Sequence, residues 1–284
     1  MIILVAFPAG AGTIRMRTSV ATKITGNLLT VTVRVRNTGN DSASKVAAAV
    51  EVRGVKATRR LSDKLRSGQG AERAITFPLN NRKGPDRPNE PNGPNGWFPV
   101  ICETMYRDDQ DNTFSIMTVT RYAFKGLPAE LDLYFQKPGE PGKSTSLALL
   151  TAGRQQRSIV ITNRSAGTRN IAVRLVHAQN IRLVPEKSSI TLEPKQKGSL
   201  ALTITNRSFN PNSTTRIHAV AEYDEGERHY TKIVSLPVTI KTAGNVFQRM
   251  NRSMIGIALL LVIILAGINL WEWKREKRKE KRPC

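Results

Sequence analysis

Residues 29–40 of the chain read LTVTVRVRNTGN. Apolar residues occupy every second position as far as Val35, and threonine or arginine fills the positions between them. This period of two predicts a β-strand with one buried face and one exposed face. The strand then meets an Asn-Thr-Gly-Asn run, which predicts a turn because asparagine and glycine tolerate a positive φ.

The same alternation continues outward from this stretch. An alternating run at 46–53 predicts a further strand, and apolar runs at 98–102 and 114–119 flank a polar turn at 108–112. No long amphipathic helix interrupts them. Six or seven short strands in such a span are typical of a β-sandwich, so we expect residues 13–125 to form one.

Two segments rich in proline and glycine break the strand pattern. Residues 83–96 read KGPDRPNEPNGPNG, and a proline at every third position predicts an extended loop that joins no sheet. Residues 126–144 are expected to be a linker. Inside that linker, apolar residues alternate over 131–135, so this piece could add a strand to either neighbouring domain.

Residues 145–243 predict a second β-sandwich. Alternating apolar runs recur through this span, and the last two, 217–223 and 230–240, flank an Asp-Glu-Gly-Glu turn. A weak internal repeat supports the division: VTVRVRNTGN at 31–40 and IVITNRSAG at 159–167 both run from a strand into an asparagine turn. We therefore expect an all-β chain with two tandem β-sandwiches of related fold.

A long apolar stretch follows the second sandwich. Residues 253–271 read SMIGIALLLVIILAGINLW, with no charge and no proline, and predict a transmembrane α-helix. Tryptophans suit the membrane interface, and the basic tail at 272–284 predicts a cytoplasmic C-terminus by the positive-inside rule. The residues that flank the predicted membrane anchor are Trp271, Trp273, Lys274 and Arg275.

Residues 1–12, MIILVAFPAGAG, are similar to the end of a secretory signal peptide, because an apolar run precedes a small-x-small cleavage pattern. They lack the basic region of a complete signal, so we interpret them as a partial signal peptide, with a first β-strand as the alternative. Together with the predicted anchor, they place both sandwiches outside the cytoplasm.

The chain is strongly basic, with a net charge of +22. The tail carries +4 of this, and the rest favours anionic neighbours such as membrane lipid head groups or acidic polysaccharides. A basic surface that serves solubility alone is the alternative. Cys102 and Cys284 fall on opposite sides of the predicted membrane, so packing rather than a disulfide must stabilise the fold.

One cluster of basic residues falls on a predicted strand and its loop. It suggests an anion-binding patch for phosphate or carboxylate groups, and a solvated face is the alternative. No aromatic residue interleaves with the cluster, which argues against single-stranded nucleic acid as a partner. The cluster consists of Arg53, Lys56, Arg59, Arg60, Lys64 and Arg66.

No catalytic constellation or cofactor motif is apparent in the sequence. Asp108, Asp109 and Asp111 could offer oxygens to calcium, but the EF-hand pattern is absent and a polar hairpin turn is the better interpretation. The histidines lack the spacing of metal ligands, although the last two could face each other across the final hairpin. The three histidines are His177, His218 and His229.

The predicted first sandwich, 13–125, resembles the bacterial and archaeal cell-adhesion-related domain, CARDB, through its strand-to-turn segment VRVRNTG at 33–39. The second sandwich resembles the alpha-galactosidase-associated bacterial Ig-like domain and the wider group of pilus-chaperone and major-sperm-protein folds, through ITLEP at 190–194 and the strand at 199–204. These resemblances imply Ig-like folds on a surface protein and specify no ligand. The proline insertion and the arginine-bearing strands depart from both patterns.

We therefore expect a non-enzymatic, single-pass envelope protein: a scaffold or accessory subunit that presents its Ig-like domains to a partner protein through sheet edges and loops. The alternative is a surface adhesin whose basic patch binds a polyanion or carbohydrate. Salt separates the two hypotheses, because association with a partner protein should tolerate salt whereas binding to a polyanion should weaken steeply.

Overall fold

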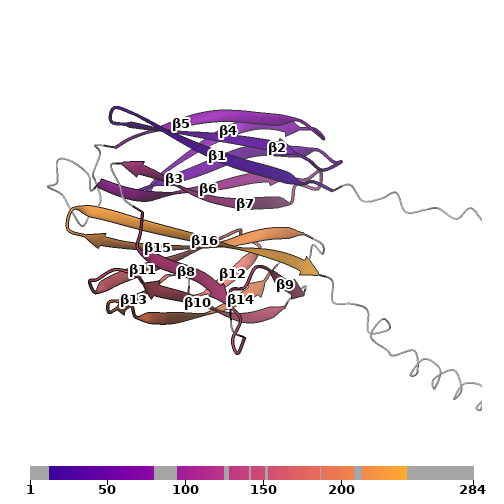
Figure 1. Cartoon of the computed structure of the whole chain (residues 1–284). Coiled ribbons are helices and arrows are strands. Elements are labelled where there is room, and N and C mark those ends of the chain that lie inside the picture. Colours follow the sequence, from indigo (N-terminus) through magenta and orange to yellow (C-terminus); the bar gives the residue numbers. More distant parts are fainter. Residues whose placement is uncertain are drawn as a thin grey trace, which may run out of the picture. The chain divides into compact units, whose positions relative to one another are not determined.

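A computed structural model describes residues 13–79, 95–124, 128–140, 142–150, 153–185, 187–207 and 213–241. These residues form sixteen β-strands, which Figure 1 shows as two groups, β1–β7 and β8–β16. The expected all-β class and β-sandwich architecture are confirmed for this part of the chain. The segments predicted as signal peptide, transmembrane helix and tail lie outside it, and no helix within it has the length and apolarity needed to cross a membrane.

The first sandwich packs a three-stranded sheet against a four-stranded sheet, with every strand pair antiparallel. The first sheet runs β1 (Met16–Thr25), β2 (Leu28–Asn37), β5 (Gly70–Pro78), and the second runs β7 (Thr113–Phe124), β6 (Asn95–Arg107), β3 (Ala43–Val52), β4 (Val55–Leu65). The alternation predicted for β2 is confirmed. Its apolar residues from Leu29 to Val35 are fully buried between the sheets, while Arg34 and Arg36 are exposed.

The second sandwich also has two layers. One sheet runs β12 (Ile181–Val184), β14 (Lys197–Asn206), β10 (Arg154–Asn163), β8 (Leu131–Gln136). The other runs β13 (Lys187–Leu192), β11 (Arg169–His177), β15 (Thr214–Glu225), β16 (Arg228–Lys241), and β9 (Leu147–Leu150) adds to β16 in parallel. Strand β8 lies inside the segment expected to be a linker. It pairs with β10 and buries Leu131, Leu133 and Phe135 in the second core, so this piece adds a strand to the second sandwich, one of the two outcomes that its alternating residues allowed.

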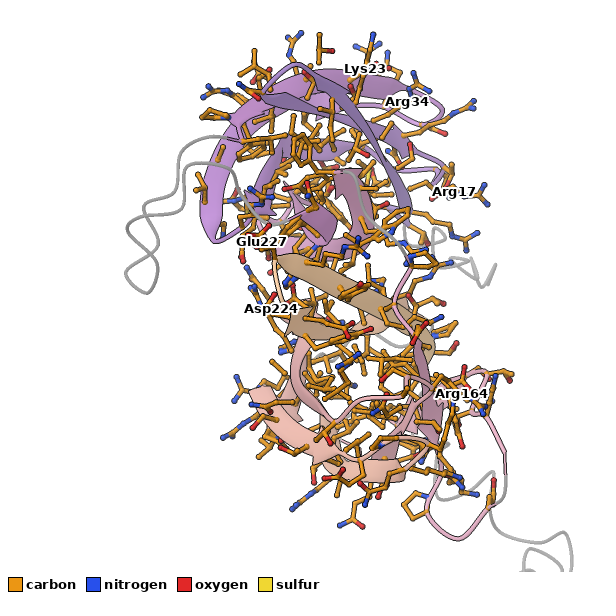
Figure 2. The ribbon with its side chains drawn as sticks, turned by 60° about the vertical axis from the view of Figure 1, so that its left-hand side comes forward. Arg17, Lys23, Arg34, Arg164, Asp224 and Glu227 are labelled. Atoms are coloured by element: carbon orange, nitrogen blue, oxygen red, sulfur yellow. The ribbon has the colours of Figure 1, made fainter. Side chains whose placement is uncertain are left out.

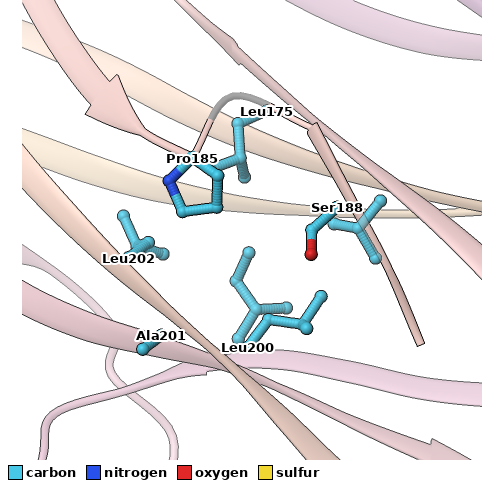
Figure 3. A pocket seen from close by; sticks show the side chains of 8 residues that line it. Leu175, Pro185, Ser188, Leu200, Ala201 and Leu202 are labelled. Atoms are coloured by element: carbon cyan, nitrogen blue, oxygen red, sulfur yellow. The ribbon is translucent and has the colours of Figure 1, made fainter.

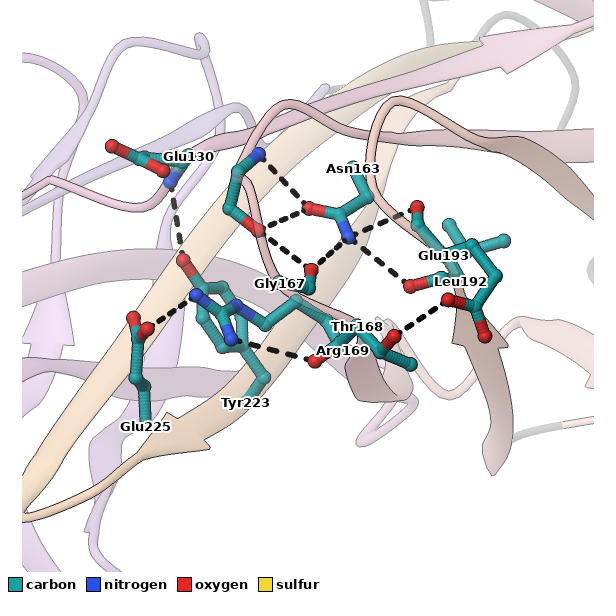
Figure 4. A network of polar contacts seen from close by, with 10 residues as sticks. Glu130, Asn163, Gly167, Thr168, Arg169, Leu192, Glu193, Tyr223 and Glu225 are labelled. Carbon is teal, nitrogen blue, oxygen red and sulfur yellow. Dashed lines mark hydrogen bonds and ion pairs between the residues drawn. The ribbon is translucent and has the colours of Figure 1, made fainter.

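The internal repeat marks the same place in both sandwiches. Asn37 ends β2 and Asn163 ends β10, and both side chains are fully buried. The Asn37 amide nitrogen donates to the carbonyls of Asp41 and Leu65 at 2.6 and 3.0 Å. The Asn163 amide nitrogen donates to the carbonyls of Gly167, Leu192 and Glu193 at 2.7 to 3.1 Å, as Figure 4 shows. Each asparagine thus ties its turn to a connection between the two sheets.

A glutamine turn completes the match between the two sandwiches. The backbone N–H of Asn37 donates to the carbonyl of Gln69, and that of Asn163 donates to the carbonyl of Gln196, both at 2.9 Å. Each glutamine side chain also accepts a backbone N–H three residues earlier, from Arg66 in one case and Glu193 in the other. The residue before each glutamine has a positive φ, +77° at Gly68 and +62° at Lys195. The repeat therefore extends beyond the segments visible in the sequence.

Candidate functional site: the seam between the sandwiches

The two sandwiches meet along a contact that we call the seam, formed by outward-facing residues of β3, β6 and β7 on one side and β11, β15 and β16 on the other. Its apolar centre joins Ile101 of β6 to Val176 of β11 and Val220 of β15, each at most 5% exposed. Met117, Val119 and Ile233 pack against them. An outward-facing apolar residue would lie in water on an isolated sandwich, so its burial stabilises the contact between the two.

A fork-shaped ion pair crosses the seam beside this apolar centre. Nη1 of Arg174 lies 2.5 Å from Oε1 of Glu51, and Nη2 lies 2.9 Å from Oε2. The hydrogen bonds to Glu51 raise the pKa of the Arg174 guanidinium, so this group stays charged. Two parallel charge-assisted bonds restrict orientation as well as distance. The pair therefore restrains the position of β3 against β11.

Backbone contacts continue the seam at its other end. Strands β16 and β6 form a short parallel ladder that pairs Arg228 with Asn95 and His229 with Gly96. Oγ1 of Thr231 donates to the carbonyl of Trp97 at 2.7 Å. Through this ladder the β7-β6-β3-β4 sheet and the β13-β11-β15-β16 sheet become one continuous hydrogen-bonded sheet.

All three histidines lie at the seam, where His177 lines the groove described below. His218 and His229 do not face each other, although the sequence allowed it. In the β15–β16 register His218 is opposite Ser235, and His229 is opposite Asp224. Nδ1 of His218 lies 2.7 Å from the Ser235 hydroxyl, and its Nε2 lies 3.2 Å from the carbonyl of Met117 across the seam. Burial lowers the pKa of His218, so the ring is held neutral.

The surroundings of His229 are acidic. Its Nδ1 lies 2.7 Å from Asp224 and its Nε2 lies 3.0 Å from Glu222, while its ring stacks on Phe98 of the first sandwich at 4.7 Å. Burial alone would lower the pKa of His229, but the two carboxylates outweigh it and raise the pKa to about 9. This ring is therefore a cation at neutral pH and joins the two sandwiches by stacking.

An open groove of about 210 Å³ runs along the seam. Its polar lining includes Glu51, Arg174 and Glu103, and Glu103 accepts a hydrogen bond from Gln179 at 3.3 Å. A second cavity, of about 10 Å³, lies between the sheets of the second sandwich, and Figure 3 shows its lining of apolar side chains around Pro185 and Leu202. That volume holds about one water molecule.

The residues of the basic cluster predicted at 53–66 have different surroundings in the structure. The Arg53 guanidinium lies 3.9 Å above the ring of Phe98 and donates to the carbonyl of Leu79 at 3.3 Å, so this residue is committed to packing. Arg60 pairs with Asp63, and Lys56 lines the seam groove. The remaining three are exposed on β4 and its following loop: Arg59, Lys64 and Arg66.

The sequence analysis missed a second set of basic residues on the outer face of the β1-β2-β5 sheet. Figure 2 shows Arg17, Lys23 and Arg34 projecting from this sheet. Arg36 occupies the next outward position of β2, directly opposite Arg17. The arginines at outward positions of residues 29–40 could be seen in the sequence. The pairing of β1 with β2, which places Arg17 opposite Arg36, could not be read from a single strand.

In the acidic turn predicted at 108–112, the carboxylates of Asp108 and Asp111 bond to other groups of the protein. Oδ1 of Asp108 accepts the backbone N–H groups of Gln110 and Asn112 at 2.9 and 2.8 Å. Hydrogen bonds from Arg107 and Lys45 lower the pKa of Asp111 to about 2. Across the residues that the structure describes, no group of three or more possible metal ligands converges.

Cys102 is the one cysteine among the residues that the structure describes. It is buried in β6, and burial raises the pKa of its thiol to about 11. The protonated thiol is a poor nucleophile, because the thiolate is the reactive form. Cys102 therefore acts as a core residue.

No protein-family model matches the chain, and no curated protein matches it. Among solved structures, a fragment of Escherichia coli alpha-2-macroglobulin from domain MG7 to the C-terminus matches with a TM-score of 0.34 and 15% identity, over 41% of this chain and 17% of that chain. The native conformation of the same protein gives a TM-score of 0.31 and 12% identity, over 80% and 17%. Red sea bream transglutaminase gives 0.26 and 12%, over 78% and 31%. This chain thus spans less than a third of the length of each of these structures.

Proposed function

We propose that this chain is a non-enzymatic binding module, in which two Ig-like sandwiches are held in a fixed relationship and present their sheet edges and loops to a partner protein. The observation that carries the proposal is the seam, with its buried apolar centre and its Arg174–Glu51 fork. Contacts between domains of one chain are often small and polar, which permits relative motion. An apolar centre flanked by an ion pair and a shared ladder instead favours one arrangement, so a partner can contact both sandwiches at once.

The cellular setting is part of the same proposal. The apolar stretch at 253–271 and the basic residues after it support a single-pass anchor in an envelope membrane, with the sandwiches on the extracytoplasmic side. Such an anchor would concentrate the module at a surface where a membrane-bound or envelope partner is available. The role is then that of a scaffold or accessory subunit.

The test is affinity purification of the tagged full chain from gently solubilised native membranes, at low and at high salt. We expect one protein to co-purify in stoichiometric amount and to stay bound at high salt. A Glu51→Lys variant faces Arg174 with a like charge and should lose that partner, because the two sandwiches no longer hold one arrangement. Recovery of polyanions alone, released by salt, would contradict the proposal.

A further inference from the structure

The outer face of the β1-β2-β5 sheet, which we call the cationic face, carries several basic side chains that do not take part in the packing of the core. The register places Arg17 of β1 opposite Arg36 of β2, and Arg34 opposite Glu72 of β5. Lys23 lies on the same face, six residues along β1. Among the described residues of these three strands, Glu72 is the one acidic residue, and it pairs with Arg34 at 2.7 Å.

The Arg17–Arg36 pair is unfavourable for the isolated fold. Side chains directly opposite in antiparallel strands have Cβ atoms about 5 Å apart, and like charges in that position destabilise the sheet. Nε of Arg36 donates to the carbonyl of Gly68 at 3.2 Å, a contact that orients the guanidinium but does not neutralise it. An anion bound between the two arginines would remove the repulsion.

Short, mostly polar side chains cover the sheet surface between these cations. The row next to Arg17 and Arg36 holds Ser19 beside the Arg34–Glu72 pair. Beyond that pair, small or hydroxyl-bearing residues fill the outward positions of all three strands as far as the row of Lys23: Ala21, Thr32, Ala74, Thr30 and Thr76. No aromatic residue occupies an outward position of these strands, in the part of the chain that the structure describes. Such a floor lets an extended chain lie flat and offers hydroxyl groups for hydrogen bonds.

This combination distinguishes between classes of anionic partner. Single-stranded nucleic acid is bound by aromatic platforms, which this face lacks. Membrane-surface elements place an apolar row beside their cations, and protein interfaces have an apolar centre. On the cationic face the centre instead carries small and hydroxyl-bearing residues together with the Arg34–Glu72 ion pair. Arginine suits carboxylate, sulfate and phosphate groups alike, because its fork binds two oxygens at once.

We propose that the cationic face binds an extended acidic polysaccharide. Its anionic groups would pair with the Arg17–Arg36 cluster at one end and with Lys23 at the other, and its sugar hydroxyls would contact the threonine floor. Six residues of β1 separate Arg17 from Lys23, about 20 Å of strand, so the site spans several sugar units. This site goes beyond the proposed partner-binding role and does not depend on the seam.

The test measures binding of the full chain to polygalacturonate. The triple variant Arg17→Glu, Lys23→Glu and Arg36→Glu reverses the unshared charges of the cationic face. The matched control is Arg59→Glu, Lys64→Glu and Arg66→Glu, which changes the net charge equally on the exposed residues of the other basic cluster. A milder variant with glutamine at 17, 23 and 36 guards against misfolding. The unfolding temperature of each variant shows whether the fold is intact.

We expect the face variant to bind polygalacturonate at least about tenfold more weakly and the control less than about threefold more weakly, a difference that general charge cannot produce because both carry the same net charge. The glutamine variant should fall between them, and salt should weaken binding of the unmodified chain. Equal losses in both charge-reversal variants would overturn the site. Anionic phospholipid vesicles or duplex DNA that bind more tightly than polygalacturonate, with the same sensitivity to the face variant, would overturn the assignment to a polysaccharide.

Discussion

Arg174 and Glu51 are 123 positions apart in the chain and form two parallel hydrogen bonds across the seam. Both side chains are partly shielded, at 38% and 23% exposure, whereas the Arg34–Glu72 pair on the cationic face is 68% and 46% exposed. Shielding from water strengthens an ion pair provided both partners are present. The Arg174–Glu51 pair should therefore contribute more to stability than the Arg34–Glu72 pair.

A double-mutant cycle on Glu51→Gln and Arg174→Met should give a coupling energy of about 1 kcal/mol or more. The matched cycle on Glu72→Gln and Arg34→Met should give nearly zero, because that pair is exposed and screened. Urea unfolding monitored by tryptophan fluorescence provides both values. Equal coupling energies in the two cycles would show that the seam pair stabilises the protein no more than an exposed ion pair does.

Alanine at Asn37 or at Asn163 should lower the free energy of unfolding by about 2–4 kcal/mol, because each change leaves at least two main-chain carbonyls without their donor. The two losses should be similar, since the asparagines hold equivalent positions. Asn112→Ala, in an exposed turn, is the control and should cost about 1 kcal/mol or less. Thermal unfolding compares the three variants. A cost at Asn37 but none at Asn163 would refute the equivalence.

Gly96→Ala should open the ladder between β6 and β16. A Cβ at this position would lie 1.8 Å from the carbonyl oxygen of His229, and φ is +149°. Gly26→Ala is the control, because that glycine also has a positive φ of +57° but has open space around its Cβ position. Hydrogen exchange should quicken at 95–97 and 228–231 in the first variant and stay unchanged there in the second. Unchanged exchange in both would show that the ladder is not needed.

The seam should weaken as pH rises above neutral. The pKa of His229 is raised from 6.5 to about 9, so its contribution is fully present below pH 6.5 and is lost as pH increases through 9. Its size is at most about 3 kcal/mol. His229→Gln should flatten this slope in a series of unfolding measurements between pH 6 and 10.

The dependence of stability on pH should have the opposite sign for His218. Burial lowers its pKa below 6.5, so the stability that depends on its neutral ring is lost as pH falls below that value. His218→Gln should therefore change the acid side of the stability profile and leave the alkaline side intact. If the His218→Gln and His229→Gln variants gave the same profile of stability against pH, the two histidines would not act on opposite sides of neutral pH.

The sequence analysis predicted the strands well, because the apolar residues of β2 and its neighbours follow a period of two that only one buried face explains. It also recognised the asparagine turns at Asn37 and Asn163. The seam could not be predicted in this way. Ile101 and Val220 are outward-facing residues within strongly apolar strands, so their pattern resembles that of core residues and gives no sign of a contact between domains.

The charged sites were harder to predict for a related reason. Arg53 and Arg60 lie close together in sequence, but one packs on Phe98 and the other pairs with Asp63. Arg17 and Arg36 lie far enough apart to look unrelated, and strand pairing brings them opposite each other. Proximity in sequence is therefore a poor guide to charge clusters in a sheet, where register decides which side chains meet.

Strand β16 also has a mechanical consequence. It is bonded along most of its length to β15, near its start to β6 and near its end to β9. A tensile force applied to the chain at Lys241 would act along the strand, while the hydrogen bonds that retain it run across that direction. The bonds are then loaded in shear and must break together instead of opening one after another. Because the ladder to β6 shares this load, tension entering the second sandwich is transmitted directly to the first.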